Sequence, residues 1–143
     1  MVRFKHRYLV ATIAAASQER IAELGPSEIL AMLRESIEAN FGDFGSGSTS
    51  QSLQVRSFDR ASGVCVIRTG RESHRMVRAS LTLLSGTKDA RLSVTVQAVA
   101  GCDRTLKAAA VEAYTRGYRR AGISDDAAAA LLQRQRQLLE AWQ

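Results

Sequence analysis

Four short stretches of the chain have patterns typical of β-strands: two alternate apolar and polar residues with a period of two, and two are largely apolar and rich in β-branched residues. The strands are expected over residues 4–16, 52–58, 64–68 and 91–100. The first stretch is largely apolar on both faces, as in the central strand of a sheet. The last alternates most regularly, so one face is expected in the core and the other in water. The predicted buried set is Leu92, Val94, Val96, Ala98 and Ala100.

Apolar residues recur every three or four positions in four other stretches, which predicts amphipathic helices. The helices are expected over residues 26–41, 71–84, 104–120 and 124–142. Pro26 with Glu28 close behind it marks a helix start, and Ser124 is placed to cap the last helix. Residues 41–50 are rich in glycine and are expected to form a loop, whereas 59–63 and 85–89 are expected to be short turns.

The order strand, helix, strand, strand, helix, strand predicts an α+β, ferredoxin-like (RRM-like) βαββαβ fold. Such a fold has a four-stranded antiparallel sheet with helices on one face, and two C-terminal helices follow here. Residues 1–101 would form the core, and residues 102–143 a helical extension packed on the core or on a neighbour, in a single domain overall. The third strand lacks the aromatic residues with which RRM domains stack bases, so ordinary single-strand recognition on the sheet is not expected.

Charge favours a polyanionic partner. The 143 residues include 20 basic and 14 acidic ones, for a net charge of +6 and a pI near 10.0. Residues 1–20 carry +3 and residues 56–91 carry +5, whereas residues 21–55 carry −4. Seventeen of the basic residues are arginine, which suits bidentate phosphate contact, although genomic base composition also favours arginine.

Other classes of function find little support in the residues. No segment reaches 18 apolar residues, so no membrane span or membrane partner is expected. The basic and then apolar start imitates a signal peptide, but its β-branched character and Thr12 favour a strand. Two histidines and two cysteines match no metal-binding spacing, and no nucleophile has a recognisable base. Neither catalytic residues nor a metal or cofactor on this chain are therefore expected.

The N-terminal strand is a candidate for nucleic-acid contact. Period two places Arg3, Lys5 and Arg7 on one side and Phe4, His6 and Tyr8 on the other. Basic side chains suit phosphates and aromatic rings suit bases. The alternative is a frayed, solvated terminus.

Two further groups of basic residues lie near helix starts. Arg68 closes the third strand, and Arg71, Arg75 and Arg78 follow at helical spacing on one face, which as an alternative is an ordinary solvated face. Arg104 and Lys107 open the third helix, where positive charge opposes the helix dipole unless an anion such as phosphate compensates.

Candidate protein contacts lie elsewhere on the chain. The outer face of the first helix is acidic, with Glu35 and Glu38, and Phe44 stands among glycines. The last helix carries Leu138 and Trp142 on its apolar stripe, which either packs on its own domain or meets a neighbouring subunit.

Several motifs of this chain resemble those of the Pop-five type protein subunits of ribonuclease P and RNase MRP. The start MVRFKHRYL is similar to that of the eukaryotic form, and FGDFG at 41–45 is similar to the loop after its first helix. GVCVIR at 63–68, followed by Arg71-Glu72, resembles the family's strand-to-helix block. Val99-Ala100-Gly101 with Arg104 resembles its Val-Ser-Gly-Thr-Ile-Arg/Lys block. These matches run in order from residue 1 to about residue 107.

The resemblance implies an RRM-like, non-catalytic subunit in a particle whose RNA performs the metal-dependent cleavage. That particle removes the 5′ leader of precursor tRNA, and its MRP relative processes ribosomal RNA precursors, so the nucleus and nucleolus are the expected location. The implied partners are the ribonuclease P or MRP RNA, nearby precursor tRNA, a TIM-barrel protein subunit and other subunits, with Mg²⁺ on the RNA. RNA contact carries over to Arg3, Lys5, His6, Arg7, Arg68, Arg71, Gly101 and Arg104. Arg75, Arg78 and Lys107 are candidates from spacing alone.

Two alternative functions stay open. One is a ferredoxin-like domain that binds a small anion in a pocket with few arginines and with little dependence on salt. The other is a protein adaptor that makes no RNA contact and uses its acidic first helix and its C-terminal helix.

Overall fold

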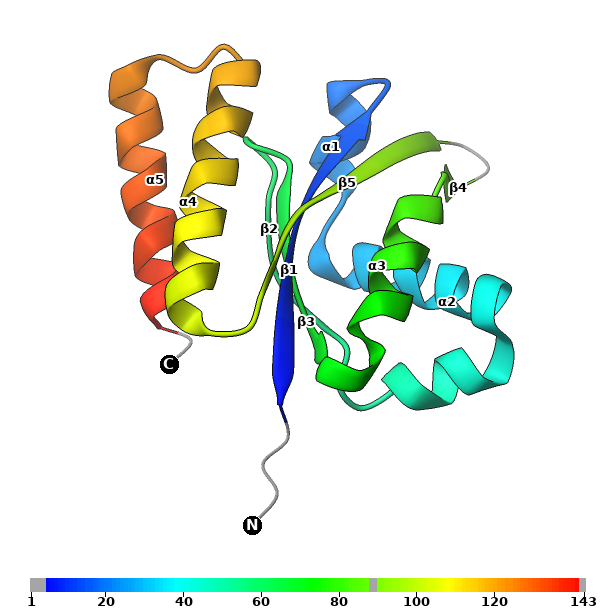
Figure 1. The fold of residues 1–143 in the computed structure, drawn as a ribbon. Coiled ribbons are helices and arrows are strands. Elements are labelled where there is room, and N and C mark those ends of the chain that lie inside the picture. Colours follow the sequence, from blue (N-terminus) through cyan, green and yellow to red (C-terminus); the bar gives the residue numbers. More distant parts are fainter. Residues whose placement is uncertain (1–4, 88–89, 142–143) are drawn as a thin grey trace.

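The computed structural model describes residues 5–87 and 90–141 as a sheet between two layers of helices (Figure 1). Five strands are present in these ranges: β1 (His6–Ala15), β2 (Gln54–Asp59), β3 (Val64–Gly70), β4 (Gly86–Thr87) and β5 (Ala90–Ala100). The helices are α1 (Gln18–Glu23), α2 (Pro26–Thr49), the 3₁₀ turn η1 (Arg71–Ser73), α3 (His74–Leu83), α4 (Asp103–Arg120) and α5 (Asp125–Glu140).

β1 is the central strand of the sheet. It pairs antiparallel with β3 on one side and with β5 on the other, and the full order is β2-β3-β1-β5-β4. Without the two-residue β4, this is the strand order of a ferredoxin-like sheet. The predicted fold class is therefore confirmed, with β4 as a short addition at the edge.

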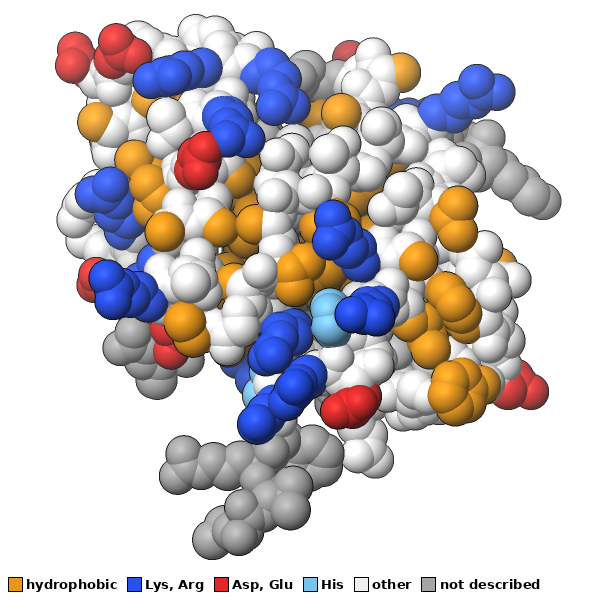
Figure 2. Space-filling view, viewed as in Figure 1, with side chains coloured by type: hydrophobic (Ala, Val, Ile, Leu, Met, Phe, Trp, Pro, Cys, Tyr) orange, Lys and Arg blue, Asp and Glu red, His pale blue; other side chains and the backbone are white. Residues whose placement is uncertain are grey.

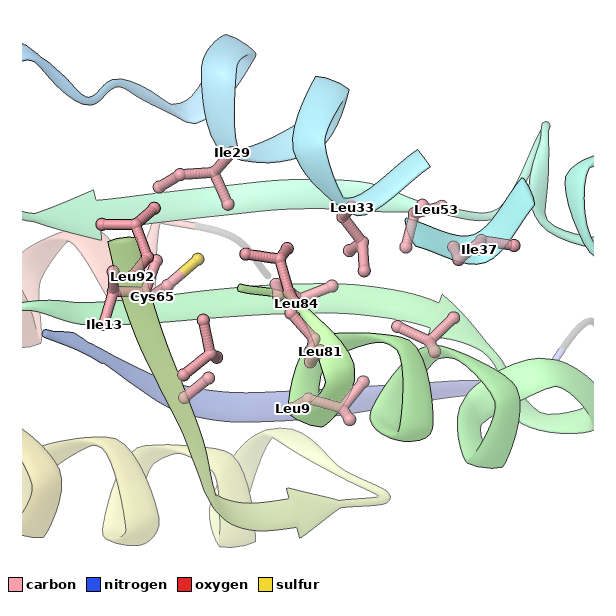
Figure 3. Close-up of a cluster of buried hydrophobic side chains, with 14 residues drawn as sticks. Leu9, Ile13, Ile29, Leu33, Ile37, Leu53, Cys65, Leu81, Leu84 and Leu92 are labelled. Carbon is pink, nitrogen blue, oxygen red and sulfur yellow. The ribbon is translucent and has the colours of Figure 1, made fainter. Parts of the chain in front are cut away.

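One face of the sheet packs against α2 and α3 (Figure 3). Leu9 and Ile13 of β1 meet Ile29, Leu33 and Ile37 of α2 there, all at most 3% exposed. The spacing of four residues along α2 aligns these side chains on one stripe, so burial of this stripe holds the helix on the sheet.

The opposite face is covered by α4 and α5 (Figure 1). Val10, Val64 and Val66 point to this side and pack with Tyr114 and Tyr118 of α4, and Leu139 of α5 closes the cluster. The open sheet face on which an RRM binds RNA is thus largely buried here. The division of the chain at residue 101 stays a prediction.

β5 changes face halfway along, contrary to the single buried face that its alternation predicts. Leu92 and Val94 join the cluster beneath α2 and α3, whereas Ala100 joins the cluster beneath α4. The register with β1 slips between Val10 and Ala11. Val10 pairs with residue 98 and Ala11 pairs with residue 96, so Gln97 is an extra residue without a partner on β1. Such a bulge inverts the orientation of every side chain beyond it.

The prediction of a loop at residues 41–50 is wrong, because α2 continues to Thr49 after a kink at Gly42. Gly42 has φ 65°, which favours glycine and redirects the helix axis. A Cβ at Gly45 would lie 3.2 Å from the Met76 sulfur, so the second segment packs closely on α3. The Ser48 and Thr49 hydroxyls each donate to the carbonyl four residues earlier. Helix α1 and strand β4 were also not predicted.

α4 approaches the turn between β2 and β3 very closely at Gly117. A Cβ at this position would lie 2.5 Å from the Ser62 carbonyl oxygen. At the next residue, the Tyr118 hydroxyl donates to Asp59 Oδ2 at 2.7 Å, and the Ser62 hydroxyl donates to the same oxygen at 2.6 Å. Burial, reinforced by Asp59, raises the pKa of Tyr118 well above its ordinary value, so the hydroxyl stays a donor.

We expect Gly117→Ala to destabilise the protein by about 1–3 kcal/mol, because the added methyl group overlaps the Ser62 backbone. Gly47→Ala is the matched control: it is also a helical glycine, but nothing lies within 4 Å of its added Cβ. Its expected effect is a gain of about 0.5–1 kcal/mol from helix propensity. Urea unfolding followed by circular dichroism measures both, and equal effects would show that α4 does not approach the turn this closely.

Candidate nucleic-acid interface

Basic residues from three strands meet at one end of the sheet. β1 begins at His6, β3 ends at Gly70 and β5 ends at Ala100, and the antiparallel register pairs His6 with Gly70 and Tyr8 with both Arg68 and Ala100. Residues just before β1, at the end of β3 and just after β5 are therefore neighbours in space. We call this end of the sheet the basic end, formed by Lys5, His6, Arg7, Arg56, Arg68, Arg71, Gly101 and Arg104.

His6 and Arg68 contact each other directly at the basic end. Arg68 Nη2 lies 3.3 Å from His6 Nε2, and Arg56 on the neighbouring strand is close enough to affect the imidazole. Burial lowers the pKa of His6, and the positive charges of Arg68 and Arg56 lower it further. A guanidinium can only donate, so His6 Nε2 accepts this hydrogen bond and the ring is neutral.

Arg7 lies over the loop that leads into α4. Its Nη1 atom donates to the His6 carbonyl at 3.1 Å, and a Cβ at Gly101 would lie 3.4 Å from the same nitrogen. The lack of a side chain at Gly101 thus makes room for the Arg7 guanidinium. Arg104, in the first turn of α4, is exposed beside this loop, and the N-cap residue Cys102 forms no side-chain capping bond. The Cys102 thiol lies beside the Thr105 hydroxyl and the backbone N–H groups of Thr105 and Arg104, and these contacts lower its pKa.

Lys5 and Arg71 line a groove on the other side of the basic end. The Arg71 N–H donates to the Lys5 carbonyl at 2.9 Å, which extends the pairing of β1 with β3 by one bond. The groove has a volume of about 820 Å³ and runs between the second segment of α2 and the start of α3. Phe44, which is 75% exposed, and Met76 form part of its wall. Phe44, a candidate protein contact, thus lies next to two candidate RNA contacts.

Other candidates lie away from the basic end or outside the described residues. Arg75 and Arg78 are exposed along α3, and Lys107 lies a turn into α4, in a small groove between α4 and α5. Arg3 and Trp142 fall outside the described residues. Among the protein-contact candidates, Glu35 and Glu38 are exposed on α2, and Leu138 is 44% exposed on α5.

Lys5, Arg7, Arg68, Arg71 and Arg104 of the basic end form no ion pair with another described residue. Within the described residues, the one pair of opposite charges within 4 Å is Arg116 with Glu112, which belongs to α4. Figure 2 shows Lys and Arg side chains gathered around a histidine, with an acidic side chain at the lower edge of the group. This surface can attract and hold a polyanion.

Arg56 is the member of the basic end that the sequence did not single out. Its place in an alternating strand predicts only that it points outward. The pairing of Gln54 with Arg68, and the slip in register between Val55 and Ser57, bring it beside His6. Strand pairing is a long-range property, so no local pattern marks this residue.

Metal and membrane features were also sought in residues 5–87 and 90–141. No cluster of three or more metal-ligating side chains occurs in these residues. None of their helices is both long and apolar enough to cross a bilayer.

The fold and the basic end define a ferredoxin-like α+β protein with one strongly cationic end of its sheet. The sequence model of the Rpp14/Pop5 family matches residues 7–111. The chain therefore belongs to the Rpp14/Pop5 family, and the resemblance to Pop-five type proteins that the motifs indicated is confirmed.

Individual relatives agree with this assignment. The chain is 28% identical over 118 residues to "Probable ribonuclease P/MRP protein subunit POP5" of Arabidopsis thaliana, covering 78% of each chain. It is 26% identical over 121 residues to "Ribonuclease P/MRP protein subunit POP5" of Schizosaccharomyces pombe, covering 78% of this chain and 87% of the other. A chain in the cryo-EM structure of yeast ribonuclease MRP shares the fold, with a TM-score of 0.57 at 16% identity over 73% of this chain and 79% of that one.

The lowered pKa of His6 predicts an acid-labile contribution to stability. The unfolded chain binds a proton near pH 6.5 more readily than the folded chain, so this contribution is lost as the pH falls from 6.5 toward the folded pKa. His6→Gln should therefore lose less stability than the wild type between pH 7 and pH 5 in urea unfolding. His74→Gln, which removes the other histidine, should keep the wild-type loss. An equal loss in wild type and His6→Gln would refute the burial of this imidazole.

Proposed function

We propose that the chain is a non-catalytic, RNA-binding subunit of ribonuclease P and RNase MRP. Its role is to stabilise the folded catalytic RNA for removal of the 5′ leader of precursor tRNA and for processing of ribosomal RNA precursors. The observation that carries the proposal is the basic end, where cations from β1, β2, β3, η1 and α4 converge. The chain belongs to the Rpp14/Pop5 family, and its relatives are named as ribonuclease P/MRP subunits, which supports assignment to these particles.

The form of the basic end supports recognition of shape and charge rather than of base sequence. Its residues are chiefly arginines, which suit phosphate contact, and α4 buries most of the sheet face on which an RRM stacks bases. The first turn of α4, which carries Arg104, adds the positive end of a helix dipole that favours a further phosphate. Such contacts hold a folded RNA in position without recognising its base sequence.

The same proposal covers partners and location. Cleavage is performed by the RNA, whose Mg²⁺ ions are held by the RNA and not by this chain. Protein contacts with a TIM-barrel subunit and with other subunits use the acidic outer face of α2 at Glu35 and Glu38, together with Phe44 and Leu138, all of them exposed. The particle works in the nucleus and nucleolus, close to its precursor tRNA substrate.

Recovery of the bound RNA tests this function directly. The tagged chain, expressed in its own cells and purified under native conditions, should enrich ribonuclease P and MRP RNA when the associated RNA is sequenced. A variant with Arg68, Arg71 and Arg104 changed to Ala should lose that enrichment. It should also bind the purified RNA more weakly than the wild type does. Protein subunits without either RNA would instead support the adaptor function.

Single arginine substitutions test the mode of contact. Arg104→Ala should weaken RNA binding and reduce the slope of log K against log salt by about one, because one phosphate contact is lost. Arg134→Ala removes a matched, exposed arginine of α5 and should leave the slope unchanged. A change in base preference at constant slope would argue for recognition of bases, and a slope near zero for the small-anion alternative.

A further inference from the structure

We propose that His6 and Arg68, with Arg56 beside them, form a proton-coupled phosphate site, in which binding of an RNA backbone phosphate draws a proton onto the His6 imidazole. The inference rests on the proposed function, because the phosphate is that of the bound RNA. It adds a titratable step to what would otherwise be contact by permanently charged arginines.

The contact between His6 and Arg68 fixes the resting state of the site. The two side chains come from paired strands, with His6 opposite Gly70 and Arg68 opposite Tyr8. Arg68 Nη2 can only donate across the 3.3 Å to His6 Nε2, so the imidazole proton resides on Nδ1. The arginine is thereby tied to a neutral histidine instead of to a carboxylate.

This resting state leaves two buried donors without acceptors. His6 Nδ1 and Arg68 Nε are both inaccessible to solvent and have no hydrogen-bond partner. Each carries a hydrogen, so each lacks an oxygen acceptor, and native proteins seldom leave such groups unpaired. His6 and Arg68 are themselves half-exposed, so small side-chain rotations can bring these donors to the surface.

Protonation of His6 breaks the resting contact. With hydrogens on both ring nitrogens, His6 Nε2 and Arg68 Nη2 become two donors facing each other, which is repulsive at 3.3 Å. Separation of the two side chains frees both cations to donate to one phosphate, whose oxygens accept from each. The proton comes from solvent, and no covalent bond forms or breaks.

The charges around His6 make this coupling strong. Arg68 on β3 and Arg56 on β2 disfavour the imidazolium, and Lys5 and Arg7 flank it on its own strand. Glu72 of η1 lines the groove with Lys5 and Arg71. On the other side, the end of β5 carries no charge, and Asp103 lies in the first turn of α4. Neither carboxylate lies within 4 Å of a basic nitrogen among the described residues. A phosphate supplies the missing negative charge, so its arrival raises the pKa of His6 from its lowered value.

Histidine NMR tests the proposal on the wild-type protein. The chain has only two histidines, so comparison with the spectrum of His6→Gln assigns the His6 signals. The ring nitrogens of His6 should titrate at a higher pH when the RNA recovered with the tagged chain is bound than when the protein is free. Inorganic phosphate at millimolar concentration provides the second arm. An equal rise with inorganic phosphate alone would overturn the assignment to the RNA backbone.

Binding measured against pH provides the second test. Wild-type affinity for that RNA should rise as the pH falls from 7.5 to 5.5, by up to about tenfold per pH unit for one coupled proton. His6→Gln should flatten this rise, and His74→Gln should keep it. The inference is overturned, and the proposed function stands, if RNA binds but wild type and His6→Gln show the same dependence on pH. The same holds if RNA binds but the His6 titration does not change. No RNA binding at any pH overturns the proposed function as well.

Discussion

Burial of the sheet on both faces is the constraint on which this structure depends. β1 is apolar on both sides, so it must lie in the middle of the sheet with helices above and below it. Its central position gives it two antiparallel neighbours, and antiparallel pairing brings the start of β1 to the ends of β3 and β5. The gathering of basic residues from distant parts of the chain follows from that arrangement.

The second helical layer also decides what the sheet can do. α4 approaches the β2–β3 turn at Gly117 and is tied to it by the hydrogen bond from Tyr118 to Asp59. With this helix in place, most of the face that an open four-stranded sheet would offer to RNA is occupied by side chains. The surface that remains lies at the strand ends, where the backbone emerges from the core and polar side chains reach solvent.

Several cations at that surface are not paired with a carboxylate. A basic residue near a carboxylate gives up part of its attraction for an external anion, and Lys5, Arg7, Arg68, Arg71 and Arg104 form no ion pair with another described residue. Arg68 is instead held by a neutral imidazole, which restrains its side chain and leaves its charge in place. An interface that must hold a large polyanion benefits from cations that are positioned in advance.

The sequence by itself determined the four main strands, the four main helices, the fold class, the family and most of the basic residues. These properties rest on local signals: a period of two or of 3.6, turn residues, and short motifs such as GVCVIR at 63–68. Only the tertiary structure decided the bulge at Gln97, the helix beyond Gly42 and the position of Arg56 beside His6. Each of these depends on strand register or on packing between distant segments. A one-residue slip in register exchanges the two faces of a strand, and no pattern within a single stretch of sequence records it.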